Sequence, residues 1–190
     1  GSSFTGDESS AFGTNALGSS ISGRNHAFGF RALQDLTTGG YNTAVGGESI
    51  ENNIDGNYNT GVGAFALRVL TTASQNTGVG GQALYHSNNN SNTAIGYYAG
   101  KGITTGARNV AVGSQAMETT GMTGDDNVAI GHQAMKSLGN SSQNVVIGNY
   151  AGDALDTGAN NVAVGYKALS NATTQSNNVA VSFAIYRGTT

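Results

Sequence analysis

Histidine and paired acidic side chains are the residues of this chain whose types could support catalysis or metal binding. His26, His86 and His132 fall at three different phases of the repeat described below, so a periodic fold would not bring them onto one face. Asp125 and Asp126 are adjacent carboxylates, but two neighbouring carboxylates lack the further oxygen ligands that a hard cation requires. We therefore expect no enzyme activity, no metal and no cofactor, and interpret Asp125-Asp126 as part of a solvated loop.

The composition differs from that of an ordinary globular core. The 190 residues include 30 glycines and no Pro, Cys or Trp, and only 10% of them are charged. Such a chain is either a disordered linker or a periodic fold with many tight turns. With a net charge of −3 and eight Lys and Arg residues scattered singly, it has no basic stripe for nucleic acid. No apolar stretch approaches the roughly 20 residues that span a bilayer, so we expect no membrane contact by this segment itself.

A five-residue motif that recurs along nearly the whole chain favours the periodic fold. It reads Asn-Val-Ala-Val-Gly at residues 161–165, and its first position, here called the anchor, returns every 16 to 18 residues, most often after 17. The anchors are Ser9, Asn25, Asn42, Asn59, Asn76, Asn92, Asn109, Asn127, Asn144, Asn161 and Asn178. We assign a structural role to the motif residues Asn42, Gly46, Asn92, Gly96, Asn109, Gly113, Asn127, Gly131, Asn161 and Gly165. Self-similarity of this period indicates a solenoid.

A second apolar piece, usually Ala-Leu or Ala-Met, follows each anchor by seven and eight residues, and Gly-, Asn- and Thr-rich turns separate the units. We predict two strands of about four to five residues per unit, in an all-β parallel solenoid (β-roll) of about eleven coils. Stacked at about 4.8 Å, such coils form a rod on the order of 50 Å long. The expected boundaries are an N-terminal leader or cloning scar at 1–8, solenoid repeats at 9–177, and an atypical terminal unit or junction at 178–190.

Side-chain alternation gives each motif strand one small face and one bulky face. The anchor Asn, the following Ala or Gly and the closing Gly share the small face, while the Thr or Val and then the Val, Ile or Phe share the other. Val110 and Val112 are too apolar to be left wet in every coil, so we expect one face inside the coil and the other against a partner chain. Alternation does not decide which is which. The anchor asparagines either stack into a hydrogen-bonded ladder or merely start turns.

The unit Asn160-Asn161-Val162-Ala163-Val164-Gly165 resembles the YadA-like head repeat of trimeric autotransporter adhesins, Asn-Ser-Val-Ala-Ile-Gly. This resemblance implies a left-handed β-roll that assembles as a side-by-side homotrimer and binds host-cell proteins or glycans. The unit here is longer and more regular, and Tyr58-Asn59-Thr60-Gly61-Val62-Gly63 also resembles repeats in the shafts of phage and viral tail fibres. Both resemblances imply an extracellular fibre, either on the bacterial surface, anchored in the outer membrane through another domain, or on a virion.

The two positions after each motif glycine vary between units and supply our candidate partner-binding or interface residues. They include Phe30, Arg31, Phe65, Tyr97, Tyr98, Tyr150, Tyr166 and Lys167. Because Tyr and Arg are enriched at binding hot spots, this column either contacts a receptor or packs across a subunit boundary. Ice binding is a further alternative, since four threonines align from Thr43 to Thr93. Val110 and later residues replace them, which favours an interface that becomes drier toward the C-terminus.

Overall fold

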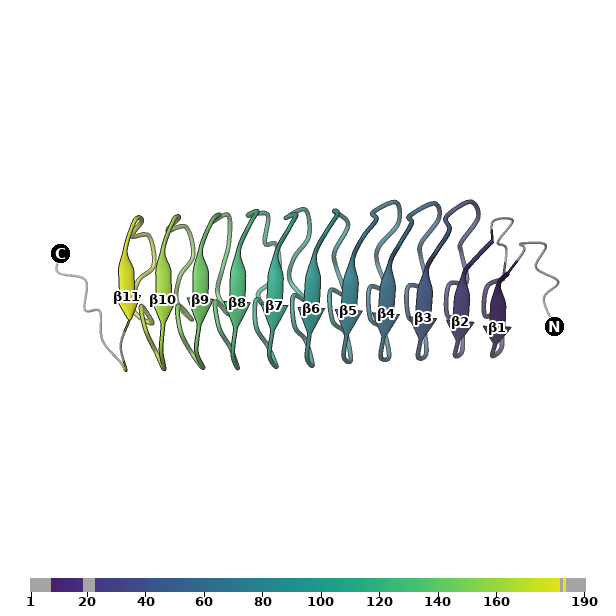
Figure 1. Cartoon of the computed structure of the whole chain (residues 1–190), viewed down its shortest axis with the longest axis horizontal. Coiled ribbons are helices and arrows are strands. Elements are labelled where there is room, and N and C mark those ends of the chain that lie inside the picture. The colour runs from purple at the N-terminus through teal and green to yellow at the C-terminus, as the bar shows by residue number, and fades with distance from the viewer. Residues whose placement is uncertain (1–7, 19–22, 182, 184–190) are drawn as a thin grey trace.

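The computed structural model describes residues 8–18, 23–181 and 183, and this part of the chain is an all-β solenoid. Its strands are β1 (Ser10–Phe12), β2 (His26–Phe28), β3 (Thr43–Val45), β4 (Thr60–Val62), β5 (Thr77–Val79), β6 (Thr93–Ile95), β7 (Val110–Val112), β8 (Val128–Ile130), β9 (Val145–Ile147), β10 (Val162–Val164) and β11 (Val179–Val181). They pair in sequence order into one sheet along the rod (Figure 1). The parallel solenoid is confirmed. Most of the predicted leader and the end of the predicted terminal unit, including Ile185-Tyr186, lie outside the described residues.

The strands pair in register, so each motif position forms a column along the rod. In the pairing of β5 with β6, Thr77 lies beside Thr93 and Val79 beside Ile95, and the other parallel pairings match the same positions. The register survives changes in coil length, because β7 and β8 also pair in phase although their anchors are 18 residues apart. The turns therefore absorb the differences in length.

Each coil contains one strand of three residues, and the prediction of two strands per unit is wrong. The Ala-Leu piece is a turn in which the Leu backbone is left-handed, with φ of 51° at Leu33 and 53° at Leu67. The turn is closed by the N–H of Ala32, which donates to the carbonyl of Gly29 at 3.3 Å. The chain reverses here because a coil of about 17 residues has to return to its starting edge. The N–H of Leu33 still donates to the carbonyl of Ser49 in the next coil, so the turns stack as the strands do.

The interior is narrow and is filled by small strand residues packed against larger turn residues. Middle strand residues such as Ala94 and Ala111 are fully buried, as are turn residues such as Leu84 and Met117. The anchor asparagines are buried on the same side. The small face of the motif strand is therefore the inner face, and the bulky face points outward. The described part of the chain contains no helix of the length and apolarity that a bilayer crossing requires.

Candidate interaction surface

Buried asparagines form a hydrogen-bonded ladder that joins each coil to the next. Asn109 accepts at Oδ1 from the backbone N–H of Asn127 at 2.9 Å, and its Nδ2 donates to the carbonyl of Gly124 at 2.9 Å. Its own backbone N–H donates to Oδ1 of Asn92 at 2.9 Å. The anchors from Asn25 to Asn161 are fully buried, and this pattern supplies partners for their amide groups, as burial requires. Of the two interpretations left open by the sequence, the structure shows the ladder.

The closing glycines of the motif are required by backbone geometry. Gly46 has φ of 127°, and a Cβ placed there would lie 2.7 Å from the carbonyl carbon and oxygen of Gly63 in the next coil. The same conflict recurs along the column, for example at Gly113 against the carbonyl oxygen of Gly131 at 2.5 Å. Only glycine combines this φ with so close an approach. The Asn and Gly of the motif therefore build the rod and leave recognition to other positions.

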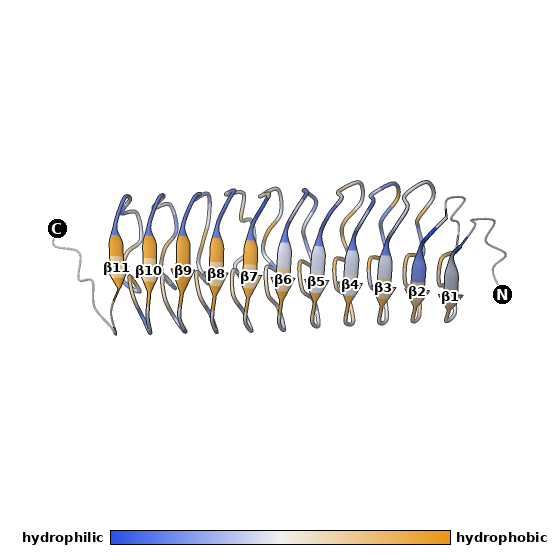
Figure 2. Cartoon of the chain, in the orientation of Figure 1, coloured by the Kyte–Doolittle hydropathy of each residue, from blue (hydrophilic) through white to orange (hydrophobic). Residues whose placement is uncertain are grey.

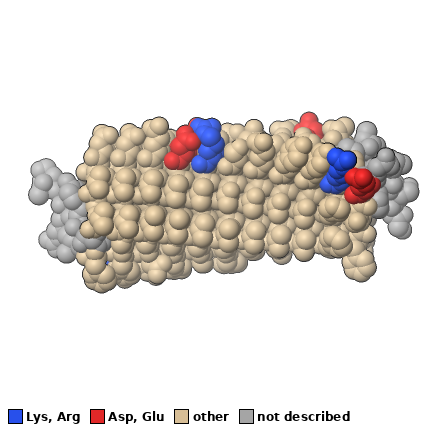
Figure 3. Space-filling view, viewed as in Figure 1, with Lys and Arg blue, Asp and Glu red and all other residues tan. Residues whose placement is uncertain are grey.

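The outward side of the strands, here called the sheet face, consists of the first and third residue of every strand. It presents apolar side chains to solvent from one end of the described rod to the other. Those more than a third exposed are Phe12, Phe28, Val45, Ile95, Ile130, Val145, Ile147, Val179 and Val181. None of the eleven strands contains Lys, Arg, Asp or Glu. In Figure 3 the charged side chains on this side gather near the upper edge and the N-terminal end. Exposed apolar side chains in a row along many strands make this face a candidate interaction surface.

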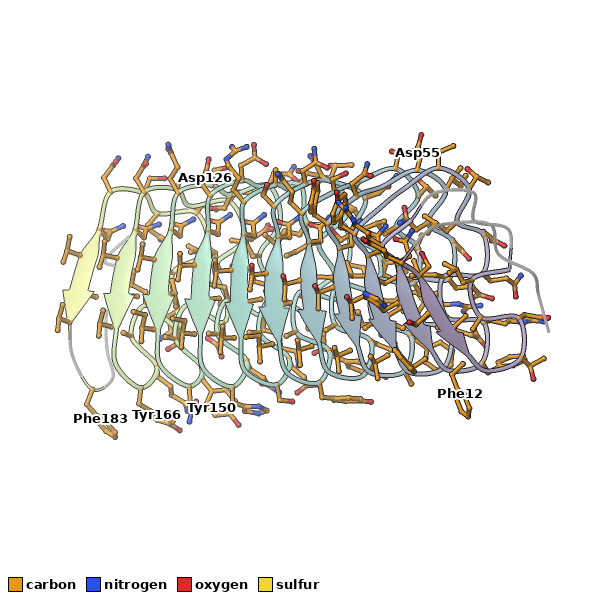
Figure 4. All side chains as sticks on the ribbon, turned by 45° about the vertical axis from the view of Figure 1, so that its right-hand side comes forward. Phe12, Asp55, Asp126, Tyr150, Tyr166 and Phe183 are labelled. Atoms are coloured by element: carbon orange, nitrogen blue, oxygen red, sulfur yellow. The ribbon has the colours of Figure 1, made fainter. Side chains whose placement is uncertain are left out.

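The residues after the motif glycines, here called the corner column, lie along one edge of this face. Figure 4 shows Tyr150, Tyr166 and Phe183 projecting beyond the ends of the strands, on the same edge as Phe12. The Tyr150 and Tyr166 rings meet edge to face with centroids 6.0 Å apart, and Tyr166 stacks on Phe183 at 5.3 Å. Lys167 Nζ lies 5.4 Å from the centre of the Tyr166 ring. Part of the predicted candidate set therefore forms one aromatic cluster with a cation at its side.

The other candidates form separate groups on the corner column. Tyr97 and Tyr98 stack with ring centroids 3.9 Å apart, and the hydrogen bond with Tyr98 raises the pKa of Tyr97. The guanidinium of Arg31 lies 4.9 Å from the centre of the Phe30 ring. Phe65 packs under a cation as well, but that cation belongs to Arg68, which the sequence did not single out. The structure thus places the eight candidates on one edge without gathering them into one site.

An ion network that the sequence analysis missed anchors the N-terminal part of this edge. The side chain of Glu51 is only 6% exposed, and its carboxylate accepts a hydrogen bond from Nε of Arg68 at 2.7 Å. A guanidinium nitrogen of Arg31 forms an ion pair with the same carboxylate at 3.6 Å. Arg68 also contacts Glu48 at 2.9 Å and donates to the Tyr85 hydroxyl at 3.0 Å. The hydrogen bond to Glu51 raises the pKa of Arg68. The sequence signal for this network was opposite charge at the same phase of consecutive units, as in Glu51 and Arg68. Because Arg31 pairs with Glu51, its charge already has a partner within its own chain.

The acidic pair at the 18-residue coil shares one arginine as its ion-pair partner. Asp126 accepts from Nε of Arg108 at 2.6 Å, and this hydrogen bond lowers the pKa of Asp126. Asp125 lies 3.4 Å from the same guanidinium and accepts from the N–H of Ala107 at 2.8 Å. Among the described residues, no group of three or more His, Cys, Asp or Glu side chains is placed to hold a metal ion.

The histidines remain apart on the rod. His26 is in β2, His86 packs edge to face on Tyr85 at 4.7 Å between ring centroids, and His132 meets Tyr150 in the same way at 5.3 Å. Burial lowers the pKa of His86. Their positions match the separate phases noted in the sequence.

A shallow groove of about 490 Å³ lies at the N-terminal end of the rod. Its lining includes Glu8, Arg24, Tyr41 and Asn57. Arg24 Nε donates to Glu8 at 2.7 Å, and its guanidinium lies 5.2 Å from the centre of the Tyr41 ring. The charged groups of the groove are therefore already satisfied by one another.

Comparison with known proteins returned no matching family model, curated protein or solved structure. Function therefore has to be inferred from the surface itself.

Proposed function

We propose that this chain is a structural and adhesive fibre module that assembles side by side as a homotrimer and displays a receptor-binding surface on a rigid rod. The observation that carries the proposal is the apolar sheet face, which the described part of a single chain leaves uncovered along its length. Burying apolar surface contributes about 25 cal/mol per Å², so association through this face is favourable. A closed ring of copies would cover every sheet face and end growth sideways.

Rigidity suits the role of a fibre. Every strand is hydrogen bonded to its neighbours in sequence order, and the asparagine ladder repeats the connection inside the rod. Each coil therefore contacts the next over its whole circumference, and the rod holds its two ends at a fixed separation of about 50 Å. A surface carried at one end is kept away from whatever anchors the other.

The number of copies, the left-handed winding and the setting rest on the resemblance to adhesin heads. In that setting the module is extracellular, on a bacterial surface, and binds a host-cell protein or glycan. The alternative is a shaft or receptor-binding segment of a phage or viral tail fibre, which the Thr-Gly-Val strands β4 and β5 favour because they match shaft-like units. In both settings, the turns that face away from the sheet and the exposed part of the corner column are the surfaces left for a receptor.

Light scattering of the purified chain tests the assembly. A mass three times 19.1 kDa is expected, and a monomer at all concentrations would contradict the proposal. Receptor binding is tested by Tyr97→Ser/Tyr98→Ser against a panel of immobilised matrix proteins and glycans, with Ser137→Ala as a control on another turn. Binding that survives the double substitution would exclude Tyr97 and Tyr98 as the receptor site.

A further inference from the structure

The sheet face changes character halfway along the rod, and from β3 onward the change is confined to one column. The first strand residue is Thr from β3 to β6, at 43, 60, 77 and 93, and Val from β7 to β11, at 110, 128, 145, 162 and 179. The third residue stays Val or Ile throughout these strands. Figure 2 shows the result as a step from pale strands to uniformly apolar ones at β7.

The change from Thr to Val has no structural consequence within a single chain. Thr and Val have nearly the same shape and both favour strands, so either residue suits an outward position in water. The hydroxyls of Thr43, Thr60, Thr77 and Thr93 are partly exposed and have no hydrogen-bond partner among the described residues, so covering the face would remove them from water. A Val column avoids this cost. The difference therefore matters only where another surface covers the strands.

The occupant that fits best is a second copy of the chain. The sheet face carries no Lys, Arg, Asp or Glu, so two identical faces meet without repulsion. Its side chains also repeat at the strand spacing of about 4.8 Å, and another copy presents ridges with the same period along its whole length. A partner without this repeat would match the face over one or two strands only.

The five strands with Val in the first position, β7 to β11, are too small in area to form a stable interface by themselves. Five strands of three residues cover roughly 25 Å by 10 Å, well below the roughly 800 Å² per partner of a standard interface. The aromatic cluster of Tyr150, Tyr166 and Phe183 borders β9 to β11 and extends the apolar surface on this side. A stable contact through this half of the rod would therefore have to include the aromatic cluster as well as the strands.

We propose that copies of this chain are held together by a dry contact through β7 to β11 and the adjoining aromatic cluster, whereas the face from β3 to β6 stays hydrated and separates first. The inference rests on the homotypic assembly proposed above and adds where that assembly is held. The C-terminal half would then hold the copies together, while the N-terminal half could separate without dissociating the assembly.

Two matched double variants of the full chain test this inference by sedimentation over a concentration series. Val145→Thr/Val162→Thr gives the C-terminal half the residues of the N-terminal half and should raise the concentration of half-dissociation at least about tenfold. Thr60→Val/Thr77→Val makes the reverse change and should leave it unchanged or lower it. Circular dichroism of both variants checks that the solenoid is retained.

Radical footprinting of the unmodified assembly provides a test that needs no variant. Ile147 in β9 and Ile95 in β6 occupy the same column and are 37% and 45% exposed in one chain. On dissociation, Ile147 should gain labelling and Ile95 should change much less. Equal gains, or an assembly indifferent to Val145→Thr/Val162→Thr, would overturn this inference while leaving the fibre proposal standing. A wild-type chain that never associates would refute both.

Discussion

Alanine at Gly46 and alanine at Gly47 should have opposite consequences, although the two glycines are adjacent. At Gly46 the φ of 127° is strained for any residue with a side chain, and the new Cβ would lie 2.7 Å from the backbone of Gly63. At Gly47 a Cβ has no neighbour within 4 Å and φ is not in the left-handed range. Combining backbone strain with a backbone clash, Gly46→Ala should cost at least about 3 kcal/mol of unfolding free energy.

Gly47→Ala should raise the stability slightly, by less than about 1 kcal/mol, because alanine restricts the unfolded chain. Urea denaturation followed by circular dichroism measures both variants, with mass measured in parallel so that the same species are compared. A Gly46→Ala protein as stable as Gly47→Ala would refute the stacked-glycine geometry, and with it the in-register solenoid.

Four further substitutions test the asparagine ladder and the charged side chains. Asn109→Asp keeps the shape but removes the Nδ2 donor and places a charge inside the rod, so urea denaturation at pH 7 should show a loss of at least about 2 kcal/mol. Arg68→Ala should cost about 3 kcal/mol because it leaves the buried carboxylate of Glu51 poorly paired, whereas Arg108→Ala, which breaks an exposed pair, should leave the stability nearly unchanged. Burial raises the pKa of Asp153, so its ionised form weakens the fold as pH rises through that pKa; Asp153→Asn should melt above wild type at pH 7 and equal it below about pH 4.

The repeat predicts the larger features of the fold because stacking identical units forces identical positions into columns. The spacing of Asn92, Asn109 and Asn127 is enough to predict the parallel register, whereas it leaves the ladder as one of two interpretations that only the structure separates. Alternation alone could not say which strand face is inside, because both faces carry residues that fit a buried surface. That choice follows from the coil's narrow interior, which admits Ala111 but not two columns of larger side chains.

The second apolar piece was assigned to a strand because it is a short apolar run between turn-forming residues. It is a turn instead, with Leu in a left-handed backbone conformation that is strained for this residue. Here the gain from placing Leu33 or Leu84 in the core outweighs that strain, at φ of 51° in both. Gly100 and Gly152 occupy the same phase, with φ of 58° and 53°, and their presence was the available sign of a turn. Glycine at a position that is otherwise Leu or Met indicates a backbone requirement that is independent of the side chain.

Thiol reactivity tests most directly the central claim that the sheet face is buried between copies. The chain has no cysteine, so a single Val145→Cys on the sheet face and a single Ser137→Cys in an exposed turn report on these positions alone. Val145 is 36% exposed in one chain. In the assembled protein, the thiol at 145 should react with a maleimide far more slowly than the thiol at 137, and the two should become alike in urea. Equal rates under native conditions would contradict the account.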